Sequence, residues 1–403
     1  MRGPGAVAVS DFTLVSALGH GRAPTLAALR EGRSGLVRRG FETARLDTWL
    51  GVVDGAEAVR FPDPLAGFDC RNNQLAELGL CADGFEHSVQ RAAQRFGAAR
   101  VGVFLGTSTS GILATEIAYR HRDPATGALP ASLDYARTHN TYSVARYVRE
   151  RLGLLGPAHV VSTACSSSAK VFATAARMIA AGLVDAAVVG GVDSLCMTTL
   201  YGFRALELVS TDICRPWDAG RAGLSLGEAA AFALLERDAA RPAAWLLGAG
   251  ESSDGHHMSS PHPEGAGAAD AMRGALAAAG LAPGDVDYLN LHGTGTPGND
   301  AAEDRAVCTV FGKTLACSST KGFTGHTLGA AGGVEAAIVL LALQHGFVPA
   351  SLNLRDPDPA LHAHIVRETA LRLLRVAASN SFGFGGSNAC LVFGAADRVE
   401  GRA

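Results

Sequence analysis

Lysine is almost missing from this sequence of 403 residues: of 35 basic side chains only Lys170, Lys313 and Lys321 are lysines. Basic and acidic residues nearly balance, at 35 against 38, which excludes a nucleic-acid-coating protein with a large excess of positive charge. Hydrophobic residues make up 48% of the chain and charged residues 18%, which is too apolar for a disordered protein. The composition therefore indicates a folded globular protein.

Long apolar runs are absent as well. No window approaches the roughly 18 to 20 uninterrupted apolar residues that a membrane span needs, and no continuous apolar segment follows a basic N-terminus. The eight cysteines show neither C-x-x-C spacing nor the density of a secreted disulfide scaffold. We therefore expect a cytoplasmic protein with free thiols, no membrane anchor and no nucleic-acid partner.

Glycine is in excess, with 49 residues or about 12% against a usual ~7%. Short β-rich runs alternate with helical stretches rich in Ala and Leu, which is typical of a layered α/β fold. The sequence predicts strands at 101–106, 159–163, 186–192, 230–236, 288–293 and 389–394. It predicts helices at 171–184, 268–280 and 332–346.

The strand-then-loop pattern of residues 6–19 restarts after residue 241. We therefore expect a duplicated α/β unit, with one half at 1–240 and the other at 241–403. The stretch 120–140 is polar and punctuated by Pro and Gly, so we interpret it as an excursion or cap on the first half.

Cys165 follows a β-branched run and precedes a Ser-rich first turn and a long amphipathic helix. A thiol at a helix N-terminus lies close to unpaired N–H groups and the positive end of the macrodipole, which predicts a lowered thiol pKa. The small neighbours Ala164, Ser166 and Ser167 leave room for a substrate at the sulfur. This segment predicts a strand-turn-helix nucleophile, and a buried structural cysteine is an equally weighted alternative.

Two histidines on glycine-rich loops favour the catalytic interpretation. His292 follows a strand and precedes alternating Gly and Thr, and His326 precedes a helix of small residues, with Lys321 five positions earlier. Phe384 stands between Gly383 and Gly385. A bulky ring on flexible glycines suits a gate, and the exposed N–H groups beside it suit an oxyanion hole.

Other signals carry less weight. Ser225 is the centre of a G-x-S-x-G pattern, but no strand precedes it as a nucleophile elbow requires. His256, His257 and His262 share one Pro-rich loop without cysteine or acidic spacing, so we predict no metal site and interpret the loop, with hydrogen bonds from Asp254 and His257, as part of the pocket wall. No phosphate-binding or dinucleotide-binding motif is present.

Taken together, the segments TACSSS, HGTGTPGND, TKGFTGHTLGAAGGVEA and NSFGFGGSN resemble the four signature segments of the β-ketoacyl-acyl-carrier-protein synthases of the type I/II kind. The resemblance runs in order from VSALG near residue 15 to the last strand. It implies the thiolase fold, with two similar α/β halves in a five-layered αβαβα arrangement, and a protein that is normally dimeric. It also implies a decarboxylative Claisen condensation of an acyl chain with malonyl-ACP.

The resemblance also implies roles for single residues. Cys165 matches the nucleophile that takes the acyl chain from a carrier thioester. His292 and His326 match the pair that holds the malonyl thioester carbonyl and promotes decarboxylation, with neutral imidazoles donating N–H bonds to the enolate. Lys321 matches the lysine that organises the histidine site and is expected to pair with Glu335.

Further matches concern the substrate channel. The backbone N–H groups of Cys165 and Phe384 correspond to the oxyanion hole, and the ring of Phe384 to the acyl gate. Thr294 and Thr296 correspond to hydroxyls that line the phosphopantetheine channel, and we expect Phe382 to contact substrate as well. No separate cofactor is expected, because phosphopantetheine arrives on the acyl carrier protein.

Two segments depart from the family pattern. Thr109 in GTSTSGI (106–112) stands where the family commonly has an apolar residue that limits the depth of the acyl pocket, which predicts a deeper or less apolar pocket. The helix opening RNNQLAELGL (71–80) also differs. These departures favour a specialised type II pathway, such as aryl-polyene or related polyketide synthesis, over housekeeping fatty acid synthesis.

Alternatives remain at this point. A thiolase shares the fold but uses a second cysteine, for which Cys390 is the nearby candidate. A non-catalytic chain-length factor lacks the nucleophile, whereas this sequence has Cys165. The chain can nevertheless be a homodimer or the active half of a heterodimer with such a chain-length-factor-like partner, and an acyl carrier protein is the expected substrate carrier.

Overall fold

The computed structural model describes residues 5–399, and an 11-stranded mixed sheet runs through its centre. Ten of these strands lie in the order β12-β11-β15-β16-β10-β1-β9-β7-β5-β6, and β2 pairs with β1. The first half contributes β1 (Val7–Ser16), β5 (Val101–Gly106), β6 (Ala158–Val161), β7 (Ala186–Asp193) and β9 (Ala229–Glu236). The second half contributes β10 (Ala244–Ser253), β11 (Tyr288–Asn290), β12 (Ala316–Ser318), β15 (Val376–Gly383) and β16 (Ser387–Ala395).

The two halves repeat one topology. Numbered along the chain within each half, both sets of strands lie in the order 3-2-4-5-1. In both, strands 2 and 3 and strands 2 and 4 pair in parallel, whereas strands 4 and 5 and strands 5 and 1 pair antiparallel. The connection between β9 and β10 contains the expected boundary at 240/241.

Strand β1 joins the two half-sheets. Its first residues, Val7 to Val9, pair with β10, and the strand continues along β9 as far as Val15. The register of β1 with β9 shifts between Val9 and Asp11, which marks a bulge or irregularity in the pairing. One strand therefore belongs to both halves and fixes how they meet.

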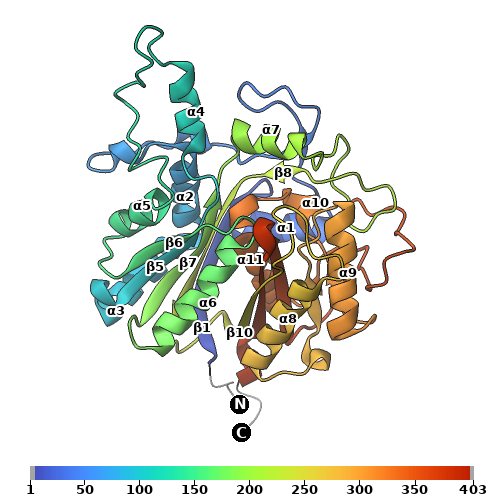
Figure 1. Cartoon of the computed structure of the whole chain (residues 1–403). Coiled ribbons are helices and arrows are strands. Elements are labelled where there is room, and N and C mark those ends of the chain that lie inside the picture. Colours follow the sequence, from blue (N-terminus) through green and yellow to red (C-terminus); the bar gives the residue numbers. More distant parts are fainter. Residues whose placement is uncertain (1–4, 400–403) are drawn as a thin grey trace.

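Helices cover and separate the half-sheets in three layers (Figure 1). The outer face of the first half carries α2 (Arg71–Cys81), α3 (Phe85–Phe96) and α5 (Ser143–Arg151), and the outer face of the second carries α8 (Ala266–Ala279) and α9 (Pro297–Phe311). Between the half-sheets lie α6 (Ser167–Ala180) and α11 (Ala331–His345). The layers are thus αβαβα, and the predicted α/β thiolase fold is confirmed.

The central layer forms the largest apolar core. Helix α11 is buried from Ala331 to Leu343, on every face, because sheets lie on both sides of it. The segment Leu328–His345 is apolar enough to cross a membrane by composition, but 89% of it is buried inside the protein. It is a core helix of the fold, since its apolar surface is covered by protein.

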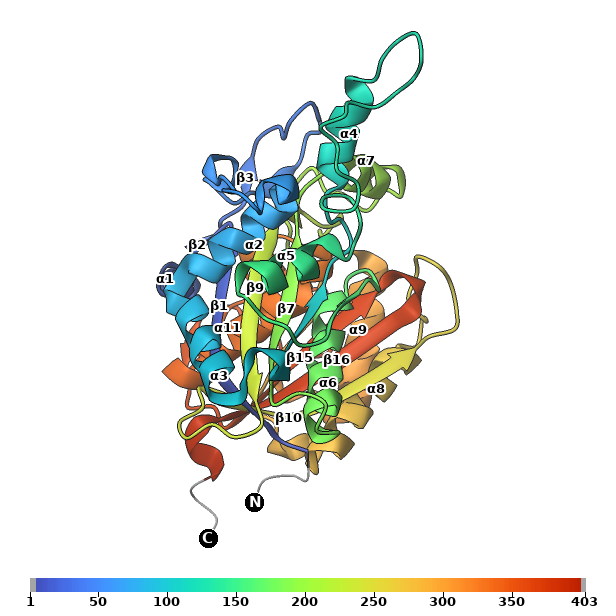
Figure 2. The same cartoon turned by 90° about the vertical axis from the view of Figure 1, so that its left-hand side faces the viewer.

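The other α-helices and strands are shorter than most of those in the layers. They are α1 (Arg22–Glu31), α4 (Ile112–Arg120), α7 (Met197–Ala205), α10 (Lys321–Thr324), β2 (Gly19–His20), β3 (Val37–Arg38), β4 (Trp49–Gly51), β8 (Leu226–Gly227), β13 (Phe347–Val348) and β14 (Ala370–Leu371). Helix α4 and the segment after it extend away from the body in both views (Figures 1 and 2). This is the stretch 120–140 that the sequence indicates as an excursion.

Candidate active site

Cys165 lies in the short turn between β6 and α6. Ala164 adopts a left-handed backbone conformation with φ of 51°, which is uncommon for a residue with a side chain and bends the chain sharply before the cysteine. Helix α6 begins at Ser167, and Ser166 is its N-cap. Cys165 is buried, with 5% of the residue exposed, and it lines a cavity.

His326 faces this thiol from the loop after α10. Its Nε2 atom lies 3.0 Å from the sulfur of Cys165, and its Nδ1 atom accepts the backbone N–H of Leu328 at 3.3 Å. A neutral imidazole whose Nδ1 accepts a hydrogen bond carries its hydrogen on Nε2. His326 therefore presents an N–H donor to the sulfur and not a free base.

His292 is held in the same tautomer by a different partner. Its Nδ1 atom lies 3.4 Å from the ammonium of Lys321, which can only donate. The ammonium also donates to the backbone oxygen of His292 and to Glu335, with which it forms a buried ion pair. The ring therefore has its hydrogen on Nε2. The sulfur of Cys165 and the nearest ring nitrogens of His292 and His326 all lie within 4.8 Å of one another.

Burial dominates the protonation of these groups. It raises the pKa of the Cys165 thiol to about 12, against the opposing charge of Lys321 and an N–H of Phe384. It lowers the pKa of both imidazoles well below 6.5, and the charge of Lys321 adds to this effect. The expectation that the helix N-terminus lowers the thiol pKa is therefore wrong for the free enzyme, because loss of hydration outweighs it.

The turn that carries Phe384 connects β15 and β16 and packs against the cysteine loop. A Cβ on Gly383 would lie 2.7 Å from the oxygen of Thr163 and 3.2 Å from the nitrogen of Cys165, so only glycine permits this approach. The backbone N–H of Phe384 acts to lower the pKa of the Cys165 thiol, against the effect of burial. The ring of Phe384 stacks on Phe203 of α7, with centroids 5.4 Å apart.

Asp254 ties the loop after β10 to this glycine-rich turn. Its N–H donates to the oxygen of Gly386 at 2.8 Å, and its carboxylate accepts from Asn388 at 2.7 Å and from the backbone N–H of His262 at 3.0 Å. All of these contacts lie beside the cavity. Asp254 therefore holds two loops of the cavity wall together.

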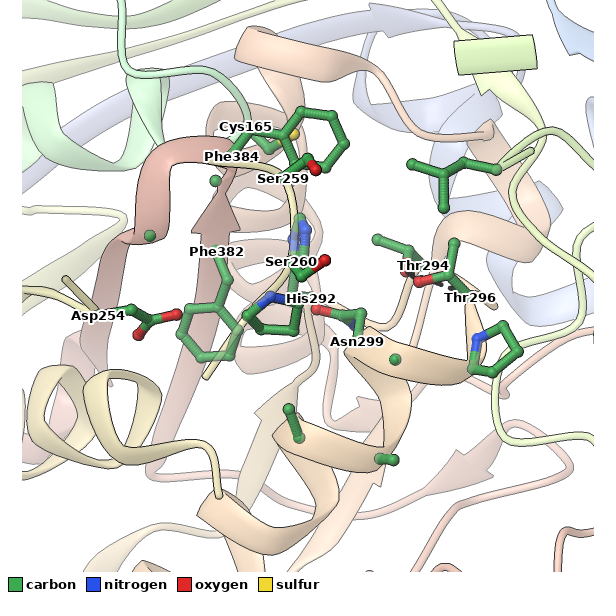
Figure 3. A pocket seen from close by; sticks show the side chains of 18 of the residues that line it. Cys165, Asp254, Ser259, Ser260, His292, Thr294, Thr296, Asn299, Phe382 and Phe384 are labelled. Atoms are coloured by element: carbon green, nitrogen blue, oxygen red, sulfur yellow. Dashed lines mark hydrogen bonds between the residues drawn. The ribbon is translucent and has the colours of Figure 1, made fainter. Parts of the chain in front are cut away.

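The cavity in front of the thiol has a volume of about 410 Å³. Figure 3 shows Phe382 and Asp254 on one side of it and Thr294 and Thr296 on the other. The two threonine hydroxyls are 2.8 Å apart, and the Phe382 ring lies 5.8 Å from that of His292. The structure thus brings most of the residues singled out in the sequence to one cavity: Cys165, Asp254, His292, Thr294, Thr296, His326, Phe382 and Phe384.

Thr109 lies elsewhere. It is buried but does not line this cavity, and its hydroxyl donates to Asp193 at 2.9 Å while accepting the N–H of Ser194 at 3.1 Å. These bonds hold the loop after β5 against the end of β7. Thr109 therefore does not line the cavity in front of the thiol, and its contact with the acyl chain stays a prediction.

Sequence reasoning missed a pair of buried carboxylates on α9. Glu303 accepts the N–H groups of His292 and Gly293, each at 2.8 Å, and Asp300 accepts the N–H of Gly295 at 3.2 Å. Burial raises the pKa of Glu303 to about 7 and that of Asp300 to about 6. Both fix the loop that carries the histidine. Their spacing of three residues directly after the His-Gly-Thr segment is the signal that could have revealed them.

The other candidates are structural. Ser225 is fully buried, and its hydroxyl accepts a backbone N–H, so it is not an exposed nucleophile. In the part of the chain that the structure describes, the side chains close enough together to hold a metal ion are those of Cys165, His292 and His326. His256, His257 and His262 do not belong to this group. Cys390 is buried in β16 and does not line the cavity.

A thiol and two imidazoles thus share one cavity in a fold built from two similar α/β halves. The family model "Beta-ketoacyl synthase, N-terminal domain" matches residues 76–240, and the model "Beta-ketoacyl synthase, C-terminal domain" matches residues 243–355. The chain belongs to the β-ketoacyl synthase family, and its reaction is that of an acyltransferase of the 3-oxoacyl-[acyl-carrier-protein] synthase class.

Known proteins are similar to this chain over nearly its full length. A 3-oxoacyl-[acyl-carrier-protein] synthase 2 of Vibrio harveyi is 35% identical over 96% of this chain and 98% of its own. Nodulation protein E of Rhizobium meliloti is 36% identical over 91% and 93%. A ketosynthase in complex with its chain length factor from Xenorhabdus doucetiae superimposes with a TM-score of 0.88, at 36% identity over 97% of this chain and 98% of that one.

Proposed function

We propose that Cys165 is the nucleophile that carries the growing acyl chain. The observation that carries this proposal is the convergence of its sulfur with two N–H donors, Nε2 of His292 and of His326, in one cavity. The thiol attacks the thioester carbonyl of the acyl carrier, a new carbon–sulfur bond forms, and the bond to the carrier sulfur breaks. The proton of Cys165 leaves with the carrier thiol. The N–H groups of Cys165 and Phe384 stabilise the oxyanion.

We infer that the two histidines act on the second substrate. The bond between the malonyl carboxylate and its neighbouring carbon breaks, CO2 leaves, and the electron pair forms an enolate. Both Nε2–H groups donate to the enolate oxygen, which requires neutral imidazoles with the observed tautomer. The enolate carbon then attacks the acyl thioester, and Cys165 leaves as a thiolate that takes a proton from water. Because loss of CO2 forms the enolate, no base is needed to remove a proton from the malonyl carbon.

Lys321 and Glu335 support this arrangement as a positioning pair. The ammonium of Lys321 fixes the tautomer of His292 through Nδ1 and is itself neutralised by Glu335. Thr294 and Thr296 are proposed to contact the phosphopantetheine arm, and Phe382 to pack beside it, since all three line the cavity. No separate cofactor enters the scheme, because the arm arrives on the carrier.

We propose that the partners are an acyl carrier protein and a second synthase-like chain, either a copy of this one or a chain-length-factor-like subunit. The similar ketosynthase from Xenorhabdus doucetiae is seen in complex with its chain length factor. Strand β6 ends the sheet, and its four residues are only half-buried, so its free edge can pair with another chain. The setting that we propose is a cytoplasmic, specialised type II pathway of the polyene or polyketide kind.

Intact-mass analysis with a panel of acyl carriers tests the proposal. Wild-type protein should gain one acyl adduct, and Cys165→Ala should gain none. Cys390→Ala is the matched control: it should keep the adduct and the condensation, whereas a thiolase that used Cys390 as its second cysteine would lose condensation. An adduct that persists in Cys165→Ala would refute the assignment. The acyl groups accepted, saturated, unsaturated or aryl, test the proposed pathway.

A further inference from the structure

Arg305 occupies a special place on the wall of the cavity. Of the lining residues in the described part of the chain, it is the only arginine or lysine. It lies on α9, the helix that begins directly after Thr296. About 13 Å of helix separates Thr296 from Arg305, at 1.5 Å per residue. The cavity therefore has hydroxyls at one point and a permanent cation about two and a half turns farther along the same helix.

Small residues line the cavity on the face of α9 between these two points. Gly298, Ala301, Ala302 and Arg305 all line the cavity, and their spacing of three, four and seven residues places them on one side of the helix. Gly298, Ala301 and Ala302 have no side chain or a single methyl group, which is too short to obstruct an extended ligand. The acidic residue of the lining, Asp254, already uses its carboxylate in bonds to two partners. No free carboxylate of the lining thus competes for the guanidinium.

Arg305 has one short hydrogen bond to the backbone and one long, exposed ion pair. Its guanidinium donates to the backbone oxygen of Pro263 at 2.5 Å and lies 3.6 Å from a carboxylate oxygen of Glu264. The side chains of the ion pair are 52% and 74% exposed, and such exposed pairs contribute little to stability. The guanidinium can therefore exchange Glu264 for an incoming anion.

We propose that Arg305 binds the phosphodiester of the phosphopantetheine arm, an inference that rests on the proposed function. The arm has amides near its thiol end and a phosphodiester at its far end. When the amides lie at Thr294 and Thr296, the phosphodiester follows this face of α9 toward Arg305. A planar guanidinium is suited to two parallel hydrogen bonds with phosphate oxygens. Arg305 is a binding residue for the arm and does not reach the reacting carbonyl.

The test compares three acyl donors: an acylated carrier protein, an acylated phosphopantetheine and an acylated pantetheine that lacks the phosphate. Acylation of Cys165 is followed by intact mass at subsaturating donor. Wild-type protein should react about fivefold faster with the phosphopantetheine donor than with the pantetheine donor, which is the scale of one exposed charge-assisted hydrogen bond. In Arg305→Gln this ratio should fall to about one. Arg305→Lys should keep part of it, because the charge remains.

Arg273→Gln is the matched control. Arg273 lies on α8, its side chain is 53% exposed, and it pairs with Asp270 on its own helix, but it does not line the cavity. This variant should keep the wild-type ratio. The proposal is overturned if Arg305→Gln slows both small donors by the same factor, if Arg273→Gln lowers the ratio equally, or if the effect appears only with the carrier protein, which would assign Arg305 to the carrier surface. Failure of all three donors to acylate the wild type would instead refute the proposed function.

Discussion

Replacing Lys321 by methionine should make the stability of the protein depend on pH in a new range. Glu335 and Lys321 are both buried, with 3% and 1% of their side chains exposed, and they form an ion pair. Burial raises the pKa of Glu335 to about 7 even though Lys321 opposes this shift. Without the ammonium, the pKa of Glu335 rises further. Glu335 then binds a proton in the folded state that the unfolded chain releases at a pKa near 4.5.

The sign of the effect follows from proton linkage. A carboxyl whose pKa is raised by folding makes the folded state less stable as pH increases, until the folded-state pKa is passed. In the wild type this loss ends near pH 7. In Lys321→Met it continues above pH 7 at about 1.4 kcal/mol per pH unit. The variant should therefore lose about 1 kcal/mol more than the wild type between pH 7 and pH 8, because the wild-type carboxyl is still half protonated at pH 7 and loses part of this energy as well.

Urea unfolding at pH 7 and pH 8 measures this difference. Lys313→Met is the matched control, since Lys313 is exposed, and it should follow the wild type. Adding Glu335→Gln to Lys321→Met removes the titrating group and should abolish the extra pH dependence. The reasoning is refuted if Lys321→Met shows no steeper loss than the wild type, or if the double variant keeps it. CO2 release from malonyl carrier should also fall by about 10²- to 10³-fold, because the tautomer of His292 is no longer enforced.

Three further predictions concern the cysteine, the two histidines and the glycine-rich turn beside them. Cys165→Ala should form no acyl adduct and no condensation product, as intact mass and product analysis would show. His292→Ala and His326→Ala should each lower CO2 release by about 10²- to 10³-fold and leave much of the acyl transfer intact; equal loss of both steps would contradict the proposed division of roles. Gly383→Ala should destabilise the protein by about 1 to 3 kcal/mol in urea and slow acyl transfer, because its Cβ meets the cysteine loop. Gly202→Ala, in open space on α7, should do neither.

The buried ion pair explains why one of only three lysines stands in this loop. Lys321 is fully enclosed, and its three donor hydrogens serve the backbone and ring of His292 and the carboxylate of Glu335. A compact ammonium fits between these groups, whereas a planar guanidinium would need more room. Almost all other basic residues of the chain are arginines. The space between His292 and Glu335 therefore explains why position 321 has a lysine.

Local sequence patterns determined most of the fold. The apolar runs at 101–106 and 186–192 correspond to β5 and β7, because a strand buried on both faces needs a continuous apolar run. The helix expected at 332–346 corresponds to α11, whose sequence is apolar throughout because the helix is buried on every face. Strand β15 was not predicted: its centre, Ser-Asn-Ser, is polar, and its pairing with β16 and β11 holds it as a strand.

The sequence by itself singled out Cys165, His292 and His326, because each stands in a glycine-rich or small-residue segment. Only the tertiary structure decided how these groups are charged. Burial between two half-sheets makes the thiol a weak acid and both imidazoles neutral, and contacts from Lys321 and Leu328 select their Nε2–H form. Desolvation and hydrogen-bond direction depend on neighbours far apart in the chain, which no local pattern contains.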